Sequence, residues 1–69
     1  MTKKEMEIIA KEYIQQEKYI QFLKKFSSDT EEINRQKEQM KGIRTITISL
    51  SCAGIDIYGV IREMWEKGL

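Results

Sequence analysis

The residues of this 69-residue chain that could do chemistry are few, and the most unusual are Cys52 and Asp56. A catalytic thiol needs a neighbouring cation or base that lowers its pKa, and acid–base catalysis at neutral pH most often uses histidine. The chain has no histidine, and no basic residue lies beside Cys52 in the sequence. We therefore expect a protein that is not an enzyme and that holds no cofactor or metal. Cys52 is expected to pack against small neighbours.

Asp56, set between two isoleucines, admits two interpretations. A buried carboxylate could carry a raised pKa or fix the register of a helix pair. Alternatively, it belongs to a polar stripe that faces water, and this interpretation is favoured. Arg44 lies twelve residues before Asp56 and could pair with it only across a hairpin or between two chains.

The C-terminal segment carries residue types that often anchor protein interfaces, namely tryptophan, tyrosine and arginine. On a helix these side chains fall on one side, together with apolar neighbours. We predict a protein-binding site formed by Ile57, Tyr58, Ile61, Arg62, Met64 and Trp65. The alternative is that Tyr58 and Trp65 complete the domain's own core.

The elements that must position these residues are helices. Apolar residues recur at helical spacing from residue 3 to 26, and the apolar face widens towards the C-terminal end through Ile14, Tyr19, Phe22 and Phe26. A turn is expected at 27–29, where either Ser28 with Glu31 or Asp29 with Glu32 fits a helix N-terminus. The second arm, about 30–67, keeps a continuous helical phase of polar and small residues. We therefore predict an all-α helical hairpin in a single small domain, with a short first helix and a long second one.

Residues 44–51 complicate the second arm because they alternate polar and β-branched side chains, as a half-buried strand does. The alternative fold is α+β, with a small two-stranded hairpin at about 43–58. The helix is favoured because the apolar phase continues through this segment. A continuous arm would be about 58 Å long, against about 36 Å for the first helix.

The unmatched part of such an arm would need a second chain to cover it. We therefore predict a homodimer that completes a helical bundle, with a possible dimer core at Ile43, Ile46, Leu50, Ala53 and Gly54. A domain this small usually needs stabilisation beyond its own core, and its single cysteine cannot form an internal disulfide. Association with a second chain would supply that stabilisation.

The net charge of +1 argues against nucleic acid as a partner, because nucleic-acid surfaces show clustered excess cations. A DNA- or RNA-binding dimer using Lys24, Lys25, Arg35 and Lys41 is the alternative. The sequence also argues against a membrane span, since Asp56 would lie inside it. One free cysteine and no secretory leader indicate a cytoplasmic protein.

The sequence thus favours a small protein-binding module, an inhibitor or regulator of larger bacterial or phage machinery that acts by helix docking. A structural assembly subunit is a further alternative.

Overall fold

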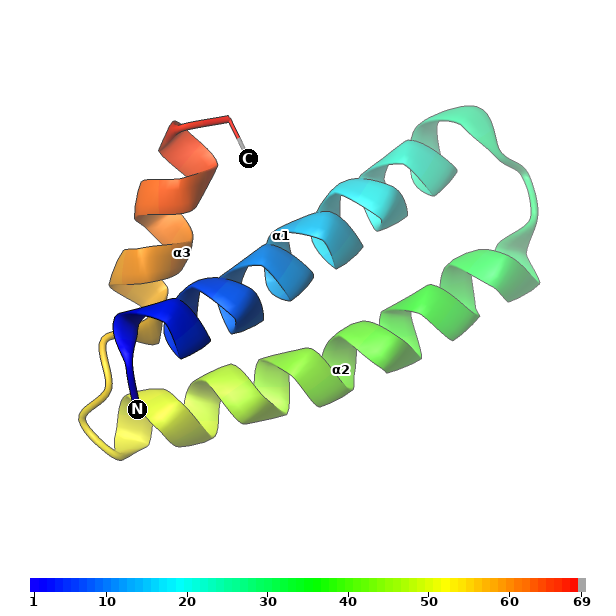
Figure 1. Ribbon diagram of the computed structural model, residues 1–69. Helices are drawn as coiled ribbons and strands as arrows, with labels where there is room; N and C mark the ends of the chain where they lie inside the picture. Colours follow the sequence, from blue (N-terminus) through cyan, green and yellow to red (C-terminus); the bar gives the residue numbers. More distant parts are fainter. Residues whose placement is uncertain (69) are drawn as a thin grey trace.

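Three helices make up the computed structural model, which describes residues 1–68. They are α1 (Lys3–Phe26), α2 (Thr30–Cys52) and α3 (Ile57–Glu66). α1 and α2 form an antiparallel hairpin, and α3 crosses α1 near its N-terminal end (Figure 1). Residues 1–68 contain no strand, so the predicted all-α class is confirmed and the two-stranded alternative at 43–58 is wrong.

Side-chain caps explain where the hairpin's two helices begin. The Thr2 hydroxyl accepts a hydrogen bond from the Glu5 amide (3.2 Å), and the Glu5 carboxylate accepts one from the Thr2 amide (3.0 Å). Asp29 caps α2 by accepting from the Glu32 amide (3.2 Å). These bonds satisfy amides that the helix itself leaves unpaired. The expected turn at 27–29 lies between the two helices.

The prediction of one continuous second arm to residue 67 is wrong, because α2 ends at Cys52. The Gly54 amide donates to the Ser51 carbonyl (3.0 Å), and the Ile55 amide donates to the Leu50 carbonyl (3.0 Å). This is the Schellman arrangement, in which glycine takes the left-handed conformation just after the helix. Gly54 has φ +84°. The turn reverses the chain while leaving apolar residues on either side of it in helical phase.

Asp56 begins α3 by accepting a hydrogen bond from the Gly59 amide (3.1 Å). It is exposed, as the polar-stripe interpretation expects. A Cβ on Gly59 would lie too close to the Asp56 carboxylate, so a larger residue at this position would require that carboxylate to shift. Arg44 pairs with Glu17 (3.3 Å) and not with Asp56.

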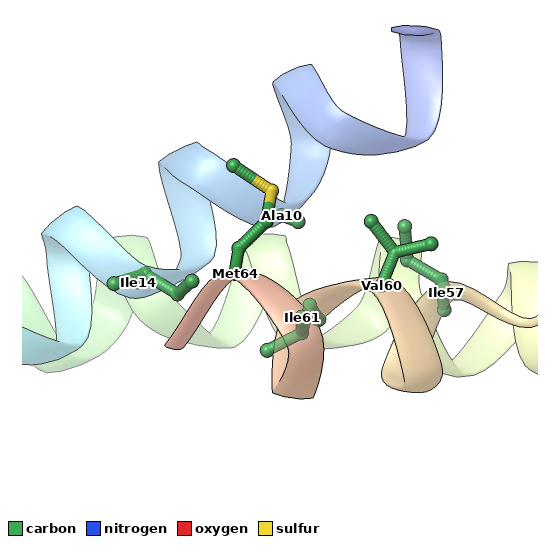
Figure 2. Packing of buried hydrophobic residues seen from close by; sticks show 6 residues of the cluster. All are labelled: Ala10, Ile14, Ile57, Val60, Ile61 and Met64. Carbon is green, nitrogen blue, oxygen red and sulfur yellow. The ribbon is translucent and has the colours of Figure 1, made fainter. Parts of the chain in front are cut away.

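The core forms where α3 meets the N-terminal half of α1. Its buried residues are Ala10, Ile14, Ile57, Val60, Ile61 and Met64. Figure 2 shows the four α3 side chains beside Ala10 and Ile14 of α1. Ala10 is fully buried, and its small side chain lets α3 approach closely. Each large side chain buried here stabilises the fold by about 1.5–3 kcal/mol.

Towards the hairpin turn, α1 and α2 pack without α3. Ile20, Leu23 and Met40 are buried there. Beside them, the Gln16 side-chain amide donates to the Gln36 side-chain oxygen (2.5 Å), and Gln36 donates to Glu32 (2.8 Å). This polar pair is satisfied, so it fixes the register of the two helices at little cost.

The turn after α2 predicts opposite effects for two glycine substitutions. Gly54→Ala should lower the free energy of unfolding by about 1–2 kcal/mol, because an L-residue is strained at positive φ. Gly42→Ala should raise it by about 0.5–1 kcal/mol, since Gly42 lies inside α2 with open space around it. Urea unfolding followed by circular dichroism measures both. In a continuous second helix, Gly54→Ala would stabilise as well, and that result would contradict the turn.

Candidate protein-binding surfaces

The six predicted binding residues of α3 divide into two groups. Ile57, Ile61 and Met64 are buried in the chain's own core. Tyr58, Arg62 and Trp65 are exposed. A partner that meets the folded chain can therefore reach the second group, and of the first group only Met64, which is 8% exposed and lines a hollow between α1 and α3.

Two of these exposed side chains also hold α3 in place. The Tyr58 hydroxyl lies 3.2 Å from the hydroxyl of the fully buried Thr47, and Thr47 donates to the Arg44 carbonyl (2.8 Å). The Lys18 ammonium lies 5.4 Å from the centre of the Trp65 ring, a cation–π distance. Tyr58 and Trp65 thus serve the intramolecular packing that was their alternative role, while part of each ring remains accessible.

The predicted dimer core does not form one exposed face. Leu50 packs against the core, and Ile43 is half-buried. Ala53 and Gly54 lie at the turn after α2, and Ile46 is exposed on α2. Self-association through this set stays a prediction.

A surface that the sequence analysis did not single out lies on the outer face of α1, away from α3. Tyr19, Phe22 and Phe26, hereafter the aromatic cluster, are 43%, 55% and 69% exposed. The rings of Phe22 and Phe26 touch, with centroids 5.1 Å apart. The signal was visible as the widened apolar face of this helix. A single core stripe cannot extend so far round a helix, so the widening marks a second surface.

A hollow of about 300 Å³ lies at the other end of α1, between this helix and α3. Its lining residues are Lys4, Glu7, Ile8, Lys11 and Met64. Ile8 is 59% exposed and lies on the same side of α1 as the aromatic cluster. The outer face of α1 therefore carries exposed apolar side chains near both of its ends.

A basic groove of about 210 Å³ lies between α1 and α2, nearer the hairpin turn. Lys24, Lys37, Lys41 and Arg44 line it, with Glu17 as the one carboxylate and with Ile20 and Met40 as apolar residues. Arg44 is engaged by Glu17 and Lys41 by Glu38, at 3.3 and 3.0 Å. Of the four cations suggested for nucleic-acid binding, the groove brings together Lys24 and Lys41. Arg35 pairs with Glu32 (3.1 Å), and Lys25 lies over the Phe26 ring (5.8 Å).

The chemistry of the remaining side chains is limited. Cys52 is exposed, so the expectation that it packs against neighbours is wrong; it sits at the very end of α2, where the chain turns. Residues 1–68 contain no group of three or more Cys, Asp and Glu side chains that could hold a metal ion. None of the described helices combines the length and the apolar character that crossing a membrane requires.

Two carboxyl groups titrate away from their ordinary range. The backbone hydrogen bond from Thr2 lowers the pKa of Glu5, aided by the Thr2 hydroxyl. The pKa of Glu63 is lowered from its ordinary value of 4.5, chiefly by the hydrogen bond from Lys67 and then by the charges of Lys3 and Lys67. The Lys3 ammonium lies 3.4 Å from Glu63 and links the start of α1 to α3.

Comparison with protein-family models, with curated proteins and with solved structures finds no match for this chain. Its function must therefore be argued from the surfaces described above.

Glu63 makes a pH-dependent contribution to stability. Its pKa is lowered on folding, so the contribution is present above the ordinary pKa of 4.5 and is lost as the pH falls through the folded value. Glu63→Gln should slightly destabilise the protein at pH 7 and have no such effect in acid. Thermal unfolding at both pH values measures the difference. Glu12→Gln, at an exposed position without an ion pair among residues 1–68, is the control; an equal loss in both variants at pH 7 would contradict the role of Glu63.

Proposed function

We propose that this chain is a small non-catalytic protein-binding module, an inhibitor or regulator that acts by helix docking, and that α1 presents its main binding surface. The observation that carries the proposal is the aromatic cluster, whose three rings are 43–69% exposed on a chain that has only six aromatic residues.

These rings are not needed to complete the fold. The core closes around Ala10 and Ile14 on the other side of α1, where α3 covers it. Phe22 and Phe26 leave more than half of their surface in water, so a partner that covers them would recover part of the about 1.5–3 kcal/mol that full burial of such a side chain gives. Contiguous exposed apolar surface of this kind is typical of interaction sites.

Tyr58, Arg62 and Trp65 support the same function as a secondary contact. Tyr58 and Trp65 already bind Thr47 and Lys18. The ring contacts seen for the aromatic cluster among residues 1–68 are those between Phe22 and Phe26 and between Lys25 and Phe26. A partner would therefore gain more newly buried area on α1 than on α3. The function proposed from the sequence is retained, and its principal surface moves from α3 to α1.

Site-specific cross-linking tests the proposed surface. A photoreactive benzoyl-phenylalanine in place of Phe22, introduced in the producing cell, should give a discrete adduct with another protein. The same group in place of Ile48, which is similarly exposed (54%) on α2, is the matched control and should not give this adduct. Phe26→Ala should weaken the adduct without unfolding the chain, because substitutions of exposed residues usually change stability by less than about 0.5 kcal/mol. No adduct from position 22, or the same adduct from position 48, would refute the proposal.

The basic groove favours a second candidate function, the binding of a nucleic acid. Lys24 and Lys37 have no ion pair within the described chain and could each neutralise a phosphate. We expect Lys24→Glu with Lys37→Glu to abolish binding of oligothymidylate, measured by fluorescence anisotropy at low salt. Lys11→Glu with Lys25→Glu changes the net charge equally and serves as the control. Binding that the two pairs weaken equally, or that salt does not weaken steeply, would exclude the groove as a nucleic-acid site.

A further inference from the structure

The outer face of α1 has the spacing of a coiled-coil seam. Its outward residues alternate intervals of four and three along the helix: Ile8, Glu12, Gln15, Tyr19, Phe22 and Phe26. All six are exposed. This alternation keeps one stripe of side chains facing a second helix over several turns. From Ile8 to Phe26 the stripe runs about 27 Å, or five turns.

One flank of the seam is basic along its whole length. It carries a lysine at every seventh residue, and we call this set the lysine line: Lys4, Lys11, Lys18 and Lys25. Three of these lysines directly precede a seam residue. In a coiled coil these positions meet the charged flanking residues of the partner helix and help to select it. Lys18 also lies over Trp65, while Lys4, Lys11 and Lys25 form no ion pair within residues 1–68.

The opposite flank is not available to a partner. Its residues are Ile9, Gln16 and Leu23, one position after Ile8, Gln15 and Phe22. Leu23 is buried, Ile9 packs against the core, and Gln16 binds Gln36 of α2. The only charged edge that an incoming helix can meet is therefore the lysine line.

The hollow beside Ile8 is consistent with the same interpretation. Lys4 and Lys11 of the lysine line form part of its wall, Ile8 and Met64 supply its apolar lining, and Glu7 is its one carboxylate, so cations outnumber anions around it. An apolar side chain that enters it would place a neighbouring carboxylate within reach of either ammonium group.

From these observations we propose that the outer face of α1 docks an acidic amphipathic helix of a different protein. The apolar side of that helix covers the aromatic cluster and fills the hollow, and its glutamate or aspartate side chains lie along the lysine line. This inference rests on the proposed function and adds the chemical class of the partner.

A second copy of the chain does not satisfy the lysine line. Two α1 helices packed antiparallel would bring lysine line against lysine line, and like charges so placed repel. Packed parallel, they would set it against Ile9, Gln16 and Leu23, which offer no carboxylate. A nucleic acid is also disfavoured, because most of the exposed seam is apolar and Glu12 interrupts it.

A designed peptide tests the inference directly. The probe is a labelled helical peptide with leucine along one seam and glutamate on both flanks, and its affinity is measured by fluorescence anisotropy. Lys11→Glu with Lys25→Glu should weaken binding about tenfold, since reversed charges at an interface lower affinity strongly. Lys24→Glu with Lys37→Glu is a close control, because Lys24 and Lys25 both lie in the last turn of α1. It should leave the affinity within about twofold, because charges away from an interface are largely screened.

A charge swap excludes a merely structural effect. A peptide with lysine in place of glutamate should bind the Lys11→Glu, Lys25→Glu variant better than the original protein. Circular dichroism and thermal unfolding confirm that both variants are folded.

Several outcomes would overturn the inference. These are equal weakening by the two lysine pairs, absence of rescue by the lysine peptide, displacement of the peptide by oligothymidylate, and sedimentation of the unmodified chain as a dimer that Phe22→Ala with Phe26→Ala dissociates. A cross-link from position 22 without affinity for the acidic peptide would overturn the partner class and leave the proposed function standing. Peptide binding without any cross-link in the cell would count against the proposed function.

Discussion

The structure depends on the docking of α3 across the N-terminal half of α1. Two helices alone would leave Ala10 and Ile14 in water, and α3 supplies the four apolar side chains that cover them. Because the chain is short, this one contact area contains most of the core. The turn after α2 is what makes the docking possible. Gly54 ends α2 in a conformation that other residues resist, and Asp56 starts α3 three residues before Gly59.

The docking of α3 also decides which apolar residues remain for binding. Ile57, Ile61 and Met64 turn inward because α3 folds back on α1 instead of prolonging α2. The aromatic cluster stays outside because α2 and α3 already occupy the other sides of α1 (Figure 1). Apolar surface that a larger core would have buried therefore stays exposed on α1. This division, a closed small core and an open aromatic face, is the physical basis for a binding role.

Apolar periodicity predicted α1. A capping pattern predicted the turn at 27–29 and the start of α2, because capping bonds join residues three apart and are legible in the sequence. The break at residues 53–56 was missed because a Schellman turn need not disturb the apolar phase on either side of it. Gly54 was its main sign, and helices tolerate an isolated glycine. Because of that break, α3 folds back on α1 and buries Ile57, Ile61 and Met64. Periodicity alone could therefore not show that these residues are withdrawn from binding. The sequence showed that the aromatic cluster is apolar. It could not show that the cluster stays exposed, because this depends on which side of α1 the other helices cover in the folded chain.

The two sides of α1 use different residues for different purposes. Ala10 and Ile14 serve the core, whereas Ile8, Phe22 and Phe26 face water, and the two sets share no member. A partner helix can therefore cover the outer face without displacing anything the fold needs. Since the outer face already exists in the free chain, binding there costs little ordering of the backbone, and preorganised surfaces of this kind lose less free energy on association. The lysine line adds selectivity to that surface, because it favours helices with an acidic edge and penalises those with a basic one.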